Sequence, residues 1–331
     1  EWFRESRADQ YRGDSLVWEV NLGLPARSSD DPKLLATFRE VLLAACRLSD
    51  SRSAVTVSAA LGALATAHGT AGGSQSGDQT RVGVIPEVIA EVIGYARSDL
   101  RTEGLHLLVD VGATTLDVST FVLHRADGDD TYEVLTAEVK RLGAHVLHQR
   151  RIRETAALVE RHLNTLVSES DGAARIPPLA EYLPRAESPD MVSIDEPLAN
   201  AAGGLVYGVI NETRKNRDPK ARAWEIGLRT FVCGGGRAVD AYGSMVSGLD
   251  RSLRKFTLTA GLQVVDLPTP EKLDAPELAP GEYHRLGVAY GLSFPAVDLG
   301  KIRLPLAIAD LEEPPESQGS YREDYVGMEQ T

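Results

Sequence analysis

Two aspartates bracket a turn of small residues in the segment LLVDVGATTLDVSTF, residues 107–121. Asp110 ends an apolar run and Asp117 begins a second one, a pattern typical of two strands joined by a tight turn. The turn consists of Gly112, Ala113, Thr114 and Thr115, whose small or hydroxyl side chains let backbone N–H groups approach an anion. A carboxylate beside such N–H groups fits a magnesium–phosphate site, because the metal must bridge carboxylate and phosphate. A plain structural hairpin would explain the same pattern.

A further carboxylate, Glu87, opens the segment EVIAEVIGYA, residues 87–96, which is predicted to be a helix. A carboxylate at a helix N-terminus interacts favourably with the helix dipole. The sequence therefore indicates either a capping residue or a catalytic acid at this position.

Three glycines, Gly234, Gly235 and Gly236, follow a strand predicted for residues 229–233. Arg237 comes next, and a helix is predicted for residues 238–253. A glycine run between a strand and a helix lets a ligand contact the backbone at the helix N-terminus. An ordinary turn is the alternative interpretation.

The elements that must position these residues follow from the same periodicities. Further strands are expected over 16–24, 80–85 and 131–139, and helices from residue 32 and over 53–67, 146–166, 198–215 and 283–294. Residues 168–200 are rich in proline and acidic residues, residues 264–281 read as a proline-rich connection, and an acidic tail is expected from residue 295.

Composition limits the classes of function. The chain has 331 residues, of which 43% are hydrophobic and 25% are charged, as in ordinary globular proteins. Its formal net charge of −13 argues against a general nucleic-acid surface. No segment has the roughly 20 apolar residues of a membrane span. Only two cysteines occur, Cys46 and Cys233, and we expect buried free thiols in a cytoplasmic protein.

Four segments, taken in order, resemble motifs of the actin, sugar-kinase and heat-shock chaperone superfamily, and are most similar to the nucleotide-binding domain of the seventy-kilodalton heat-shock chaperones. Residues 110–117, DVGATTLD, resemble the second phosphate loop, D-[LIVS]-G-x-G-x-[TF]-[DH]. Residues 87–95 resemble the connecting element N-E-P-x-A-A-A-I-A-Y, and residues 232–237 resemble the adenosine loop V-G-G-S-x-R-I-P. Residues 288–291, VAYG, are identical to the core of the closing helix. Ala113 and Thr114 replace two glycines of the phosphate loop, and Arg237 comes one residue early.

The resemblance implies an α/β, bilobal, actin-like ATPase (ribonuclease H-like) fold with mixed sheets flanked by helices. Residues 1–100 would be the remainder of a first lobe, and residues 101–294 a second lobe with a small outer subdomain at about 148–200. Residues 295–331 would be an acidic tail or linker. No D-x-G-[TS] hairpin, the first phosphate loop of the superfamily, is found before Leu16, so the N-terminal part of such a domain is expected to be missing.

The same resemblance implies site roles. Asp110, Glu87 and Asp117 would be catalytic, with Asp110 and Asp117 facing Mg²⁺ directly or through water. The turn 112–115 would bind the phosphates of ATP or ADP, and residues 234–237 would bind the adenosine. The expected partners are an adenine nucleotide and a protein bound through the outer subdomain or the acidic tail, with no nucleic acid and no membrane.

The expected function is an ATP-dependent conformational switch with Mg²⁺-assisted ATP hydrolysis, similar to a heat-shock chaperone ATPase. Two other functions stay open. One is a catalytically degenerate nucleotide-sensing or scaffold module, which the substitutions Ala113 and Thr114 favour. The other is an actin-like filament protein.

Overall fold

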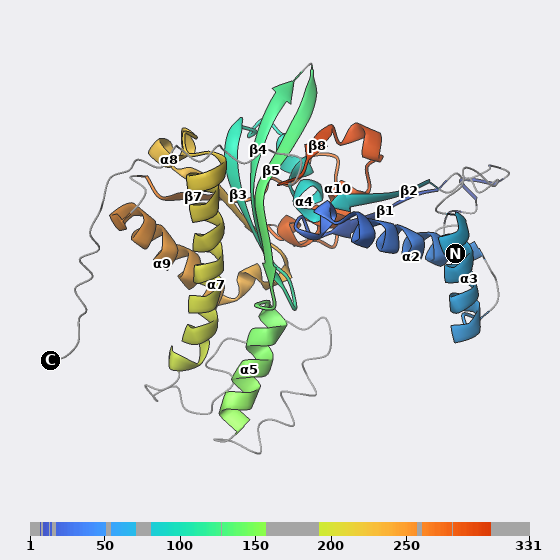
Figure 1. Ribbon diagram of the computed structural model, residues 1–331, viewed down its shortest axis with the longest axis horizontal. Coiled ribbons are helices and arrows are strands. Elements are labelled where there is room, and N and C mark those ends of the chain that lie inside the picture. Colours follow the sequence, from blue (N-terminus) through green and yellow to red (C-terminus); the bar gives the residue numbers. More distant parts are fainter. Residues whose placement is uncertain are drawn as a thin grey trace, which may run out of the picture.

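The chain forms an α/β structure built on two sheets (Figure 1). The computed structural model describes residues 7, 9–12, 14, 18–50, 54–70, 81–126, 128–156, 192–256, 260–279 and 281–305. The larger sheet is mixed and has six strands in the order β7-β6-β3-β4-β5-β8, and the smaller is the parallel pair β1–β2. The expectation of mixed sheets flanked by helices is confirmed.

The centre of the larger sheet is an antiparallel meander of three long strands. They are β3 (Gly104–Val111), β4 (Leu116–Ala126) and β5 (Asp129–Lys140). Alternating β-branched and aromatic residues make these segments suited to a pleated sheet. The strand–turn–strand prediction over 107–121 and the predicted third strand are confirmed.

Parallel strands extend the meander at both edges. On one side, β6 (Leu228–Cys233) pairs with β3, and β7 (Leu262–Val265) pairs with β6. On the other side, β8 (Lys301–Arg303) pairs with β5. Strand β7 begins before the expected proline-rich connection and runs into it, and β8 lies in the segment expected to be an acidic tail.

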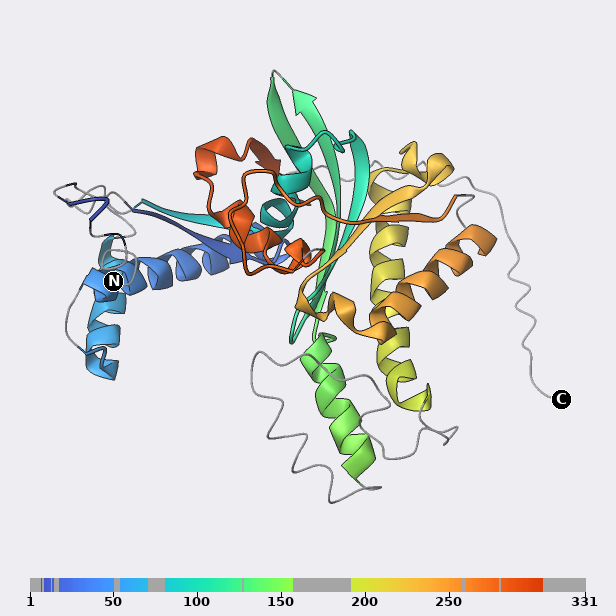
Figure 2. The same ribbon diagram turned by 180° about the vertical axis from the view of Figure 1, so that it is seen from behind.

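Most helices between β5 and β7 lie on one face of this sheet, whereas the first of them extends beyond the ends of the strands (Figures 1 and 2). They are α5 (Ala144–Ala156), α7 (Val192–Glu212), the π-helical turn η4 (Thr213–Arg217), α8 (Ala223–Ile226) and α9 (Asp240–Phe256). Leu107 and Val109 of β3 pack into this layer, together with Val206 of α7 and Val246 of α9. The described part of the helix predicted for 146–166 ends at Ala156, and most of the expected outer subdomain lies outside the described residues.

The opposite face is covered by α4 (Glu87–Ala96) and α10 (Gly287–Leu292). Leu108 of β3 and Phe231 of β6 pack there with Ile89 and Ile93 of α4. The two helices cross at a close backbone contact, because a Cβ atom on Gly291 of α10 would overlap the carbonyl oxygen of Ala90.

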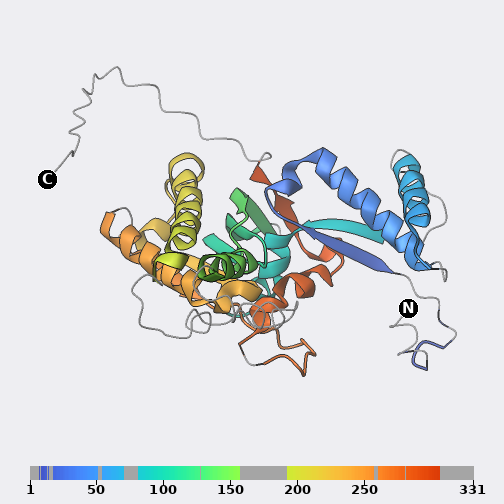
Figure 3. The same cartoon turned by 90° about the horizontal axis from the view of Figure 1, so that it is seen from below.

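The smaller sheet lies beyond α4 and α10 (Figure 3). Strand β1 (Glu19–Leu24) pairs in parallel with β2 (Arg81–Pro86), and the connection between them carries α2 (Pro32–Asp50) and α3 (Val57–Thr70). Strand β2 runs directly into α4, so Glu87 is placed where the smaller sheet meets the larger one. No described helix is both long enough and apolar enough to cross a lipid bilayer.

Candidate functional site

The two aspartates of the hairpin face each other across β3 and β4. Asp110 is the cross-strand partner of Asp117 in the antiparallel register, so both side chains lie on the same face of the sheet. Side chains alternate along a strand, and Asp110 shares its face with Leu108, which packs against α4. Both carboxylates therefore face α4, the helix that begins with Glu87.

Glu87 completes the group of carboxylates predicted from the sequence. Its side chain lies on Gly23 of β1, where a Cβ atom would be 2.8 Å from Glu87 Cγ. Burial and the charge of Asp117 raise the pKa of Glu87. Burial likewise raises the pKa of Asp117, and a hydrogen bond from Thr115 opposes that rise. The structure thus brings Glu87, Asp110 and Asp117 into one electrostatically coupled group.

Asp110 is the most strongly perturbed of the three. Burial, followed by the charges of Asp117 and Glu87, raises its pKa from 3.8 to about 7. Negative charge is therefore costly at this position without a nearby cation. Perturbed carboxylates that converge in this way are typical of functional sites.

Glu91, one turn further along α4, belongs to the same group and was not predicted. The residue is only 2% exposed, and its Oε1 atom has no hydrogen-bond partner among the described residues. Burial and then the charge of Asp110 raise its pKa to about 8. Its spacing of four residues from Glu87 places both on one helix face, and this was the signal available in the sequence.

The turn between β3 and β4 is held from behind by the start of α5. The carbonyl oxygens of Gly112, Ala113 and Thr114 accept hydrogen bonds from Ala144 N (3.0 Å), His145 N (2.7 Å) and Gly143 N (3.0 Å). The N–H group of Gly112 is bonded to Thr115 O (3.0 Å). Within the described part of the chain, the N–H groups of Ala113 and Thr114 have no backbone acceptor, and both residues are exposed. The carbonyl oxygens of the turn are thus used in hydrogen bonds within the protein, and two of its N–H groups are left to interact with an anion.

The glycine run lies directly against this hairpin. Gly234 has φ +81° and ψ 162°, a conformation open to glycine, and a Cβ atom on it would overlap Asp110 Oδ1. A Cβ atom on Gly236 would be 2.6 Å from Val111 Cγ1 and 2.7 Å from Ala144 Cβ. Gly235 is exposed and has open space around it. The two predicted ligand loops are therefore neighbours, although they are far apart in the sequence.

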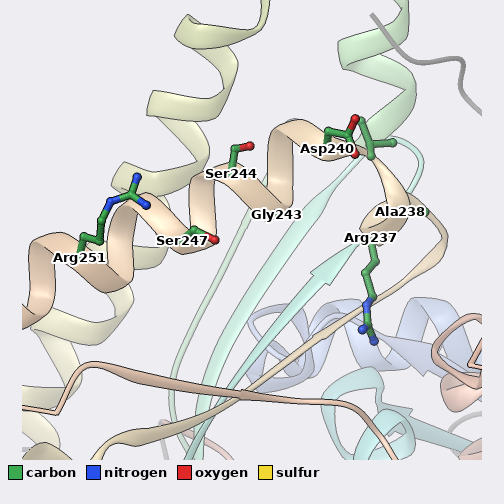
Figure 4. A pocket seen from close by; sticks show the side chains of 8 residues that line it. Arg237, Ala238, Asp240, Gly243, Ser244, Ser247 and Arg251 are labelled. Carbon is green, nitrogen blue, oxygen red and sulfur yellow. The ribbon is translucent and has the colours of Figure 1, made fainter.

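Arg237 leaves this centre and forms an ion pair with Asp266. It also lines a pocket of about 480 Å³ that continues along α9 (Figure 4). Arg237 lies at one end of this pocket and Arg251 at the other, with Ser244 and Ser247 between them. The lining residues are Arg237, Ala238, Val239, Asp240, Gly243, Ser244, Ser247 and Arg251.

The described residues contain no group of three or more His, Cys, Asp or Glu side chains arranged to hold a metal ion by themselves. Comparison with protein-family models gives no match, and comparison with curated proteins gives none either. The geometry of the carboxylates and the two loops is therefore the basis for the functional argument.

Proposed function

We propose that this protein binds an adenine nucleotide with Mg²⁺ and hydrolyses ATP as a conformational switch, with an actin-like fold similar to that of the heat-shock chaperone nucleotide domain. The observation that carries the proposal is the convergence of Asp110, Asp117 and Glu87 with two glycine-containing loops at one edge of the sheet. Glu87 lies beside β1 of the smaller sheet, and the two aspartates come from strands β3 and β4 of the larger sheet.

The residues present fit a magnesium–phosphate group. Asp117 Oδ1 is buried and has no hydrogen-bond partner among the described residues. Burial and the charges of Asp117 and Glu87 raise the pKa of Asp110, so a nearby cation would favour its ionised form. A divalent cation held mainly by phosphate and water needs few protein ligands, which agrees with the lack of a closed ligand set. The N–H groups of Ala113 and Thr114 supply donors for phosphate oxygens.

The protein groups would act mainly by position and charge. Bound Mg²⁺ would neutralise the phosphate charge that develops during transfer, and little covalent chemistry is required of the protein. Asp110, held against Gly234, would orient the attacking water. Glu87 would help to order that water, and Asp117 would hold the metal directly or through water.

The fold supports this proposal. An antiparallel meander of β3, β4 and β5 followed by the parallel strands β6 and β7 is compatible with the ribonuclease H-like sheet that the resemblance implies. Glu87 begins α4, which packs against the larger sheet, whereas Asp110 and Asp117 belong to the sheet itself. A ligand bound between the helix and the sheet would contact both, so it could favour one arrangement of the two, which is the property a switch requires.

A nucleotide-sensing module without turnover is the second candidate. Ala113 and Thr114 add Cβ atoms to a loop that has glycines in the chaperones, which favours binding without efficient catalysis. For both candidates, we also propose a protein partner that binds the outer subdomain or the acidic tail. A cytoplasmic location is part of both proposals. The low cysteine content of the chain, with Cys46 and Cys233 alone, is compatible with that location.

Calorimetry with Mg-ATP, combined with a phosphate-release assay, tests the proposal. We expect binding by the parent, and in Asp110→Asn a loss of turnover at least about tenfold larger than the loss of affinity, because the carboxylate acts mainly in the transition state. Asp129→Asn, at the far end of the meander, is the matched control. Binding without turnover would select the sensing module, and no binding of Mg-ATP or Mg-ADP would refute both candidates.

A further inference from the structure

Gly234 and His284 hold each other through two hydrogen bonds. The backbone N–H of Gly234 donates to the carbonyl oxygen of His284 (3.1 Å), and the His284 ring atom Nδ1 lies 3.0 Å from the carbonyl oxygen of Gly234. Fifty positions separate the two residues. His284 belongs to the 3₁₀ turn Tyr283–Arg285, which comes just before α10. His284 thus contacts both polar groups of the Gly234 backbone, and the Gly234 carbonyl oxygen also accepts a hydrogen bond from Arg237 N (3.2 Å).

We propose that His284 is a positioning residue of the nucleotide-binding loop, which clamps Gly234 so that residues 234–236 keep the conformation a nucleoside would contact. This inference rests on the proposed function. It concerns a side chain outside all four motifs, because the matching part of the closing helix begins at Val288.

The loop needs such a clamp because glycine has more backbone freedom than any other residue. Gly234 stands in a conformation with positive φ, and a Cβ atom added to Gly235 would meet no atom within 4 Å outside its chain neighbours. Nothing in the side chains of three glycines can order the segment, so hydrogen bonds must do it. The clamp also keeps Gly234 against Asp110. One contact therefore positions the glycine loop relative to the carboxylates.

The hydrogen on the ring can be assigned by chemistry. A backbone carbonyl oxygen only accepts, so Nδ1 of His284 must carry the hydrogen. Burial and the charge of Arg237 lower the pKa of His284, the Gly234 carbonyl and Glu282 raise it, and Arg285 lowers it. Nδ1–H is present in both the neutral and the protonated ring, so the clamp should persist on either side of the His284 pKa.

Two substitutions of His284, to asparagine and to alanine, distinguish loss of the hydrogen bond from loss of the imidazole ring. The asparagine side-chain amide places an N–H group near the position of Nδ1, whereas alanine has no donor. In the protein without ligand, we expect His284→Ala to speed backbone hydrogen exchange at residues 233–237. The variant should also bind Mg-ATP more weakly. Each effect should be about 2- to 12-fold, the range for loss of one hydrogen bond. His284→Asn should restore both. His68→Ala, at an exposed histidine of α3, is the control.

The results separate the clamp from the proposed function. Unchanged exchange in His284→Ala would overturn the inference, and so would faster exchange with unchanged Mg-ATP affinity. The difference in Mg-ATP affinity between His284→Ala and the parent should be similar at about pH 5 and about pH 8, because Nδ1–H persists across that range. A difference seen at only one of these pH values would contradict the inference. If the parent fails to bind Mg-ATP, the proposed function fails, while the exchange comparison still decides whether His284 holds the loop.

Discussion

Replacing Glu91 by glutamine should remove much of the dependence of stability on pH. Burial and the charge of Asp110 raise the pKa of this carboxyl from 4.5 to about 8. The folded protein therefore keeps a proton on Glu91 at pH values where the unfolded chain has lost it. For a carboxyl with a raised pKa, this means that stability is undiminished below about pH 4.5 and falls as the pH rises to about 8.

The magnitude follows from the window between these two values. Each pH unit inside it costs about 1.4 kcal/mol, so Glu91 should lower the free energy of unfolding by about 3 kcal/mol between about pH 5.5 and about pH 7.5. Glutamine has nearly the same shape and no charge, so this part of the decline should disappear. Asp110, whose pKa is raised to about 7, contributes a decline of the same sign in both proteins.

Urea denaturation followed by far-ultraviolet circular dichroism at several pH values would measure this effect. Glu91→Gln should be more stable than the parent at about pH 8 and should differ little from it near pH 5. Glu225→Gln, on the exposed face of α8, is the control and should follow the parent. The same slope in Glu91→Gln and the parent would refute the assignment of a buried, protonated Glu91.

Three further predictions concern Gly234, the ion pair between Arg151 and Asp195, and the ionisation of Asp110. Gly234→Ala should destabilise the protein in urea by about 2 kcal/mol or more, because its Cβ atom would meet Asp110 Oδ1 at a positive φ, whereas Gly235→Ala should be nearly neutral. Arg151 donates hydrogen bonds to both carboxylate oxygens of Asp195, from Nε (2.9 Å) and from Nη2 (2.6 Å). Arg151→Met should therefore lower the free energy of unfolding by about 3–5 kcal/mol, measured by thermal unfolding, because Asp195 loses this partner. A variant as stable as the parent would contradict this. Mg-ATP binding near pH 6.5 should release protons, seen by calorimetry in buffers of different ionisation enthalpy, because a cation favours ionised Asp110. Asp110→Asn should reduce the release, and an equal release in the variant and the parent would contradict this.

Much of the local structure could be predicted because its signals are local. Helix α4 begins and ends where the apolar spacing of residues 87–96 indicates, and the hairpin follows from its two alternating runs. Strand β7 was missed because LQVV is a short apolar run next to a proline-rich segment, and its pairing with β6 is a tertiary effect. Strand β8 spans three residues, which is too short for any periodicity.

The candidate site was predictable to a similar extent. The motif pattern selected Asp110, Asp117 and Glu87, and the structure places them together. Glu91 was missed because its four-residue spacing from Glu87 forms no recognised motif, and its importance depends on Asp110, which comes from strand β3. The partner of Arg237, Asp266, lies beyond the end of β7, and spacing along the chain gives no indication of that contact.

The crossing of α4 and α10 also has a mechanical consequence. Gly291 brings backbone against backbone at Ala90, and Gly287 leaves room for the Glu91 carboxylate, since a Cβ atom there would be 2.5 Å from Oε1. Helices usually resist sliding because side-chain ridges fill grooves on the partner. A crossing made by glycines instead lets the two backbones touch, so a larger residue at position 287 or 291 would push α10 away from α4. The separation of the two helices, and with it the space around the Glu91 carboxylate, is therefore set by the absence of two side chains.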